Sequence, residues 1–285
     1  MSSMQQTPAQ TTVATHADID GVARRRDVLF AMPRPSRRFL PVWRRNYLVW
    51  RKYLFERVLS NIIEPLITLV AFGYGLGSLL PEVGGATYLQ FLASGSICMS
   101  VMYSAKFESL WGAYSRMETQ KTWAAIMNTP SSIDDIVLGE VAWAGSKALV
   151  TGVAMLLVIW GLGVARSPLA LLALPALFLS ALTFSAMALI VNSLARGYDT
   201  LSNYFVVVVT PMVFLSGVFF PLEQLTPWLR VVAQWLPLAA MVDLVRPLIL
   251  GHTPQHLVRD LALLLVYGVG CYYVALIFTR KRLLK

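Results

Sequence analysis

Long apolar runs alternate with short polar runs along most of the chain. Each apolar run is near the ~20 residues that an α-helix needs to cross the hydrocarbon of a bilayer. The pattern therefore predicts an all-α integral membrane protein with six transmembrane helices. We expect them at residues 58–80, 88–110, 141–164, 169–193, 201–219 and 257–279.

The segment before the first span, residues 37–57, predicts an amphipathic helix. Its large apolar residues recur at spacings of four, four, three and four, on one helical face: Phe39, Trp43, Tyr47, Trp50 and Leu54. Arginine and lysine fill much of the rest, which suits the interface of a membrane with the cytosol. A nucleic-acid-binding arm is a weaker interpretation, because the helix runs directly into a span. Residues 1–36, rich in Thr, Gln, Ala, Pro and Arg, read as a disordered cytosolic tail.

The polar segment between the second and third spans is unusually long, from residue 111 to about 140. Residues 117–128 predict one short helix with mixed charge and an exposed Trp123, ending at Asn128-Thr129-Pro130 because proline disfavours helix in the residue before it. Ser131 or Ser132 can cap the next helix. The segment is either a docking element for a cytosolic partner or a membrane-surface loop without one.

Residues 220–250 are apolar but interrupted by four prolines, so their helical stretches are too short to cross. We expect two helices that dip into the outer leaflet and return, as a re-entrant hairpin before the last span. Asp243 and Arg246 stand three apart and could pair on one helical face.

Composition and charge agree with a membrane protein. Hydrophobic residues make up 56% of the 285 residues and charged residues only 14%, whereas a soluble domain carries about 25% charged residues. With the N-terminus in the cytosol, twenty of the 24 lysines and arginines fall on the cytosolic side. This distribution predicts that both termini are cytosolic, and it explains the net charge of +9 better than nucleic-acid binding does.

Few side chains suggest chemistry. Glu64 is an acid well inside the first span, where a gating role and a structural role are both open. Tyr74, Tyr103 and Tyr204 could line a polar path or simply pack. We find no catalytic cluster, no metal-ligand cluster and no phosphate-binding loop. We therefore expect no enzyme activity and no cofactor on this chain.

Four blocks of sequence are distinctive: VWRRNYLVWRK (42–52), IVLGEVAWAGSKAL (136–149), TPMVFLSGVFFPLEQL (210–225) and PLAAMVDLVRPLILG (237–251). In this order they resemble the ABC-2 class of ABC exporter permeases, and within it the nodulation-factor exporter permease family NodJ. The resemblance covers about residues 40–285.

The resemblance implies a half-transporter of the bacterial inner membrane. Two permease chains would pair around a path, and two copies of a separate ATPase, which binds ATP and Mg, would dock beneath. The cargo would be an amphiphile such as a lipo-oligosaccharide, exported outward, with membrane lipid around the path. Residues 117–128 would be the coupling helix, with Glu118, Lys121, Trp123 and Met127 as candidate contacts. The interfacial helix would also abut the ATPase, as it does in relatives. Its candidate membrane-interface residues are Trp43, Arg44, Arg45, Tyr47, Trp50 and Arg51.

Two other functions stay open. The same machine could export a drug or a lipid without sugars, because both need an amphipathic path. An ion-coupled secondary transporter would need buried acids in several spans and a repeated half. Only Glu64 is a clear candidate for such an acid, and no internal repeat is evident, so this third function ranks lower.

Overall fold

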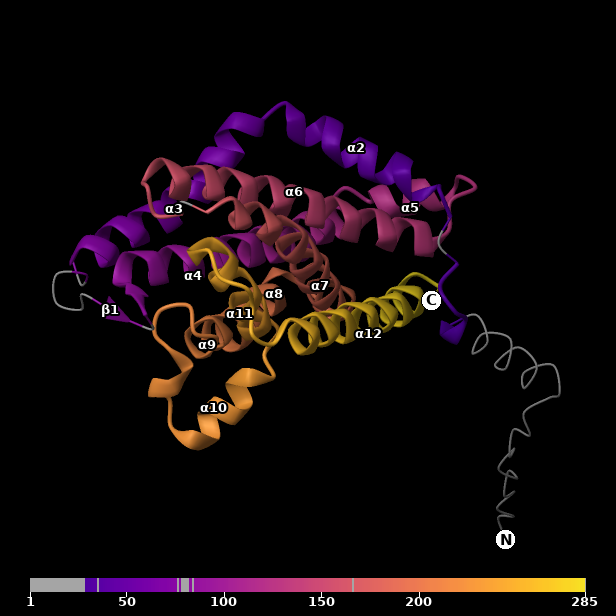
Figure 1. The fold of residues 1–285 in the computed structure, drawn as a ribbon. Coiled ribbons are helices and arrows are strands. Elements are labelled where there is room, and N and C mark those ends of the chain that lie inside the picture. Colours follow the sequence, from indigo (N-terminus) through magenta and orange to yellow (C-terminus); the bar gives the residue numbers. More distant parts are fainter. Residues whose placement is uncertain are drawn as a thin grey trace, which may run out of the picture. The chain divides into compact units, whose positions relative to one another are not determined.

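The fold is taken from a computed structural model, which describes residues 29–34, 36–75, 77, 82–83, 85–165 and 167–284 (Figure 1). The side chains of residues 57, 58, 60–62, 64 and 74 are not among those described. Two sequence predictions, on Glu64 and Tyr74, therefore concern side chains outside the described set. Most of the predicted tail, residues 1–28, is outside it as well.

The described chain is mostly helical. Its first half comprises α2 (Phe39–Arg51), α3 (Leu54–Gly75), a small antiparallel pair β1 (Glu82–Val83) and β2 (Ala86–Thr87), α4 (Tyr88–Phe107), the π-helices η1 (Glu108–Gly112) and η2 (Ser115–Thr119), α5 (Thr122–Met127) and α6 (Ile133–Gly161). Its second half comprises the 3-10 helix η3 (Pro168–Leu172), α7 (Ala173–Leu194), α8 (Tyr198–Tyr204), the π-helix η4 (Phe205–Val209), α9 (Thr210–Leu215), the 3-10 helix η5 (Leu222–Gln224), α10 (Pro227–Gln234), α11 (Pro237–Leu250) and α12 (Leu257–Leu283).

Among the described residues, four helical segments are long and apolar enough to cross a membrane: Ile133–Gly161, Pro168–Leu194, Tyr198–Leu215 and Leu257–Leu283. The chain is thus a multi-pass membrane protein. Two further helices, α3 with 22 residues and α4 with 20, lie where the first two spans are predicted. α10 and α11 meet at a bend of 82° within the proline-broken segment, as a broken span or a re-entrant pair would.

Small residues let the central helices approach closely. α7 packs on α4, α6, α11 and α12, and its buried positions include Ala176, Ser180, Ala181 and Thr183. A Cβ on Gly268 of α12 would stand 2.9 Å from the Thr183 hydroxyl of α7. Such close contacts replace the hydrophobic effect as the source of helix association in a bilayer, because lipid tails are as apolar as leucine.

Two hydrophobic clusters divide the core. The larger joins α4, α6, α7, α9 and α11. The smaller joins η1, η2, α5, α6, α7, α8 and α12 around the buried Trp123. We refer to the region of α5 and the smaller cluster as the α5 end, and to the region of β1, β2 and η5 as the β1 end.

Local signals explain where the helices of the α5 end begin and stop. Ser132 caps α6, since its side chain accepts from the Asp135 N–H while the Asp135 carboxylate accepts from the Ser132 N–H. α5 stops at Met127 with Asn128 as its cap, as Pro130 predicts. The prediction of one helix over 117–128 is wrong, because Lys121 adopts φ +50° and separates the π-helical turn η2 from α5.

Candidate functional site

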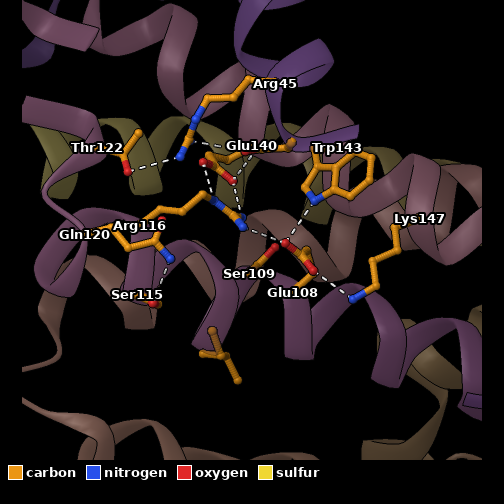
Figure 2. A network of polar contacts seen from close by, with 12 residues as sticks. Arg45, Glu108, Ser109, Ser115, Arg116, Gln120, Thr122, Glu140, Trp143 and Lys147 are labelled. Atoms are coloured by element: carbon orange, nitrogen blue, oxygen red, sulfur yellow. Dashed lines mark hydrogen bonds and ion pairs between the residues drawn. The ribbon is translucent and has the colours of Figure 1, made fainter. Parts of the chain in front are cut away.

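A buried network of charged and polar side chains lies at the α5 end (Figure 2). Its two acids are Glu108, at the start of η1, and Glu140, in the second turn of α6, and their side chains are 7% and 1% exposed. Charges this deeply buried are costly unless each is paired and hydrogen-bonded. The structure meets this condition at both acids.

Arg116 of η2 bridges the two acids. Its Nε and Nη2 donate to the two oxygens of Glu140 at 2.9 and 2.6 Å, and its Nη1 lies 2.9 Å from Glu108 Oε1. Burial disfavours the charged form of Arg116, but the two carboxylates outweigh it and raise the pKa. Lys147 and the Trp143 indole, both on α6, donate to Glu108 at 2.7 and 2.9 Å.

Glu140 also receives donors from two elements outside the spans. The Trp123 Nε1 of α5 donates to Glu140 Oε1 at 3.1 Å, and the Asn46 amide of α2 donates to Oε2 at 3.3 Å. A second link joins the same elements, from Arg45 Nη2 to Thr122 Oγ1 at 3.2 Å. Burial and the nearby Arg116 lower the pKa of Arg45, against the opposite effect of Glu140. One carboxylate thus connects α2, η2, α5 and α6.

The structure corrects the prediction of an exposed Trp123. Its side chain is 1% exposed and is the largest fully buried side chain of the described residues. From residue 121 to residue 128, the exposed positions are Lys121, Ala124, Ala125 and Asn128. Met127 is half-buried against the smaller core cluster. The exposed face of α5 is therefore made of small and polar residues, while Trp123 on its buried face anchors the helix to Glu140.

Glu118 and Lys121 lie beside this anchor, at the surface. Glu118 Oε2 accepts from Lys121 at 3.0 Å and Oε1 accepts from Arg282 of α12 at 2.8 Å. The bond from Lys121, assisted by that from Arg282, lowers the pKa of Glu118. Arg282 also donates to three carbonyls at the C-terminal end of α7, which satisfies groups that the helix leaves open.

The α2 residues predicted to face the membrane interface divide between two surroundings. Trp50 is 4% exposed and packs edge-on against Trp143 of α6. Trp43 stacks on Tyr47, and its Nε1 donates to Ser146 of α6 at 3.1 Å. The aromatic face thus lies largely on α6. Arg44 and Arg51 are exposed.

Tyr103 and Tyr204 both lie near the places where two helices change to π-helical geometry. Lys106 of α4 is fully buried, donates to the Tyr204 hydroxyl at 3.0 Å and lies over the Phe184 and Tyr204 rings. η1 and η4 begin within two residues of this pair, and the rings of Tyr103 and Phe205 are 5.4 Å apart. Asn192 of α7 donates to two carbonyls of η1. π-helical turns are frequent at functional sites.

Asp243 and Arg246 lie near the β1 end, and the prediction that they pair with each other is wrong. Asp243 pairs with Arg259 of α12 at 3.5 Å. Arg246 instead attaches α11 to α4 and to the turn after α9. Its Nε donates to Ser94 Oγ at 3.0 Å, its Nη2 donates to the Gly217 carbonyl at 2.6 Å, and its guanidinium lies 3.7 Å from the Phe91 ring centroid.

The acids and lysine of the network were not predicted as site residues, although one signal for them exists. Glu140, Trp143 and Lys147 stand three and four residues apart, which places them on one face of a helix. In the structure Glu140 bonds Arg116 of η2, and Trp143 and Lys147 bond Glu108 of η1 (Figure 2).

Comparisons with known proteins agree with this architecture. A family model described as ABC-2 type transporter matches residues 37–250. Nodulation protein J of Rhizobium leguminosarum bv. trifolii is 39% identical over 259 residues, which are 91% of this chain and 99% of that protein. Nodulation protein J of Bradyrhizobium diazoefficiens is 40% identical over 254 residues, which are 89% of this chain and 97% of that protein.

A more distant relative is named as a transport permease. The inner membrane transport permease YadH of Escherichia coli (strain K12) is 26% identical over 234 residues, which are 79% of this chain and 91% of that protein. The family match covers the buried network, α5 and the bent pair α10–α11. On these grounds the chain belongs to the ABC-2 type transporter family, as a permease similar to nodulation protein J.

Proposed function

We propose that the chain is the transmembrane subunit of an ATP-driven exporter in the bacterial inner membrane, with ATP hydrolysed by a separate subunit. Two copies of the chain pair around the transport path, and two ATPase subunits dock on them. The observation that carries the proposal is that α5 is anchored on one face and exposed on the other. Trp123 fixes this helix to the buried network, while Ala124, Ala125 and Asn128 remain exposed on its other face.

In this proposal α3 and α4 complete a set of six spans with the four long apolar segments. Both termini and the α5 end face the cytosol, as the distribution of lysine and arginine indicates. The β1 end and the α10–α11 pair then face outward.

The network gives ATPase motion a route into the spans. A displacement of α5 moves Trp123. Because Trp123 is hydrogen-bonded to Glu140, the displacement passes to α6, and from Glu140 to η2 and α2 as well. Because hydrogen-bonded charges tolerate little change of geometry in a buried site, these elements move as one body. Rigid α6, 29 residues long, carries the displacement toward the opposite leaflet.

The docking part of the proposal is tested by co-purification with the cognate ATPase. Ala125→Arg places a long cation on the exposed face of α5 without touching the network. We expect it to abolish capture of the ATPase and to leave the thermal unfolding of the permease unchanged. Gln255→Arg, at an exposed position before α12, is the matched control and should retain capture. Capture by Ala125→Arg at the control level would show that the ATPase docks elsewhere.

The cargo is proposed to be an amphiphile with a sugar head and a lipid tail, of the lipo-oligosaccharide or lipid-linked glycan class. The supporting observation is the similarity to nodulation protein J of two species, over 91% and 89% of the chain. In proteoliposomes holding permease and ATPase, an N-acyl oligosaccharide should stimulate ATP hydrolysis and accumulate on the far side. Stimulation by lipids or drugs alone, with none by the oligosaccharide, would assign the chain to export of sugar-free cargo.

A further inference from the structure

A cavity of about 560 Å³ opens at the β1 end. It is lined by three separate parts of the chain: Thr68 and Phe72 of α3, Tyr88 at the start of α4, and Phe214, Phe219 and Gln224 on and after α9, among others. Its size falls within the range of small-molecule sites, which are usually about 300–1,000 Å³ and mostly apolar.

The lining of this pocket is aromatic and uncharged. Five of the nine residues that line it are Phe or Tyr, and the described lining includes no Asp, Glu, Lys or Arg. Phe214 and Phe219 stack with ring centroids 5.4 Å apart. Thr68 and Gln224 are the hydrogen-bonding side chains besides the Tyr88 hydroxyl. A sugar or a charged head group needs many more polar partners than this, since each unpaired polar group that is desolvated costs free energy.

The rim of the pocket continues into apolar helix surface. Phe72 and Phe214 line the pocket and are themselves 47% and 51% exposed. Ile67 of α3 and Val207 of η4, on the flanking elements, are 62% and 70% exposed. A chain of methylene groups can therefore pass from the hydrocarbon of the bilayer into the pocket without crossing a polar barrier.

We propose that this pocket holds the hydrocarbon tail of the exported amphiphile on the outer side of the permease. That the ligand is the exported cargo rests on the proposed function. That the ligand is a hydrocarbon chain follows from the lining of the pocket alone. The tail lies among the five aromatic rings, and the head remains outside, next to Gln224. The aromatic lining thereby binds the apolar part of the cargo and does not select among different sugar sequences.

The test is photolabelling of the permease–ATPase complex in nanodiscs. The probe is a long-chain N-acyl disaccharide with a diazirine at the far end of the acyl chain. We expect covalent label on residues 68–72 and 214–224, mapped by mass spectrometry, and competition by the unlabelled compound. The same disaccharide with its diazirine on the sugar should label no more than Gln224 at the mouth of the pocket and should leave Thr68, Phe72, Phe214 and Phe219 unlabelled.

Variants make the assignment specific. Thr68→Trp fills the pocket from α3, and Gln224→Trp fills it from the loop side in case the first variant folds poorly. Excluding even two methylene groups from an apolar site costs about tenfold in affinity, so labelling should fall by about tenfold or more. Ile67→Trp adds the same indole at the neighbouring exposed position and should retain the label.

Two results would overturn the proposal. A phospholipid with the same diazirine chain could label the pocket equally, without competition from the glycolipid, which would make the pocket a crevice for bulk lipid. The sugar-linked diazirine could label it instead, which would make it a glycan site. Neither result depends on ATP hydrolysis or transport, so failure of the pocket proposal is distinguishable from failure of the proposed exporter function.

Discussion

The two ends of this permease handle polarity in opposite ways. At the α5 end, two buried acids and their cations form a network in which every carboxylate oxygen accepts hydrogen bonds or ion pairs (Figure 2). At the β1 end, a cavity of about 560 Å³ is lined by aromatic rings and neutral side chains. Nearby, Arg246 joins α11 to α4 and to the turn after α9 by hydrogen bonds to Ser94 and the Gly217 carbonyl.

This difference matches two mechanical tasks. Hydrogen bonds between buried charges depend steeply on distance and direction, so a network of them holds its elements in one arrangement. Contacts between aromatic and aliphatic groups are non-directional, so an apolar pocket accepts chains of various lengths. The α5 end is thus suited to passing on a movement, and the β1 end is suited to holding apolar chains of various lengths.

Removal of Glu140 should produce the largest effect on stability. In Glu140→Leu the indole of Trp123 and the amide of Asn46 lose their acceptor, and Arg116 keeps only Glu108. Breaking a buried ion pair from one side typically costs about 3–5 kcal/mol. Equilibrium unfolding in mixed micelles measures the loss, and ATPase capture should fall with it because α5 loses its anchor.

A second variant separates electrostatics from packing at the same site. Glu140→Leu combined with Arg116→Met removes the excess positive charge and leaves Glu108 paired with Lys147. The double variant should therefore recover part of the stability lost by Glu140→Leu. If the double variant lost as much stability as Glu140→Leu and Arg116→Met lose separately, added together, the network would stabilise the fold by packing alone.

The sequence predicts much of the framework of the α5 end and little of the network. Hydrophobic periodicity locates the helices. Local rules place the end of α5 before Pro130 and the cap of α6 at Ser131 or Ser132, of which Ser132 is the cap in the structure. The depth of Trp123 depends on Lys121, whose left-handed backbone turns α5 onto Glu140. No local sequence pattern predicts that turn, because lysine adopts positive φ only where the surrounding structure imposes it.

Pairing of charges at the β1 end is equally hard to predict. Asp243 and Arg246 share a helical face by spacing, yet each finds its partner on another element. Sequence spacing reports only which residues are neighbours within a helix, whereas the packing of α11 on α4 and α12 decides which partners are in reach. The aromatic pocket likewise combines residues more than 130 positions apart, from Thr68 to Phe219.

A glycine substitution at the β1 end should have the next largest effect. A Cβ on Gly95 of α4 would stand 2.4 Å from the Val218 carbonyl oxygen, which is main chain and cannot rotate away. Gly95→Ala should therefore destabilise the fold by about 1–3 kcal/mol, in the range of other overpacked sites. The measurement is the same unfolding titration.

Gly270 of α12 provides the control, since beyond its own turn of helix no atom of the described residues lies within 4 Å of a Cβ built there. Gly270→Ala should be neutral or stabilise by up to about 1 kcal/mol through helix propensity. If Gly95→Ala proved as mild as the control, close backbone contact would not be what positions the turn after α9.

The smallest effect is expected at the surface of the α5 end, where Glu118 pairs with Lys121 and Arg282. These pairs are partly exposed, so Glu118→Gln should cost only about 0.2–1 kcal/mol at neutral pH and low salt. Because the pKa of Glu118 is lowered in the folded protein, its stabilisation is complete above the ordinary pKa of glutamate. It is lost as the pH falls through the lowered value.

Wild type and Glu118→Gln should consequently differ at neutral pH and converge in acid. Glu223→Gln, at an exposed acid of the β1 end that makes no ion pair within 4 Å to a described residue, should track the wild type throughout. A difference that persisted in acid would mean that Glu118 acts by shape and not by charge. In that case the buried acids alone would account for the electrostatic contrast between the two ends, since the surface pairs would add nothing to it.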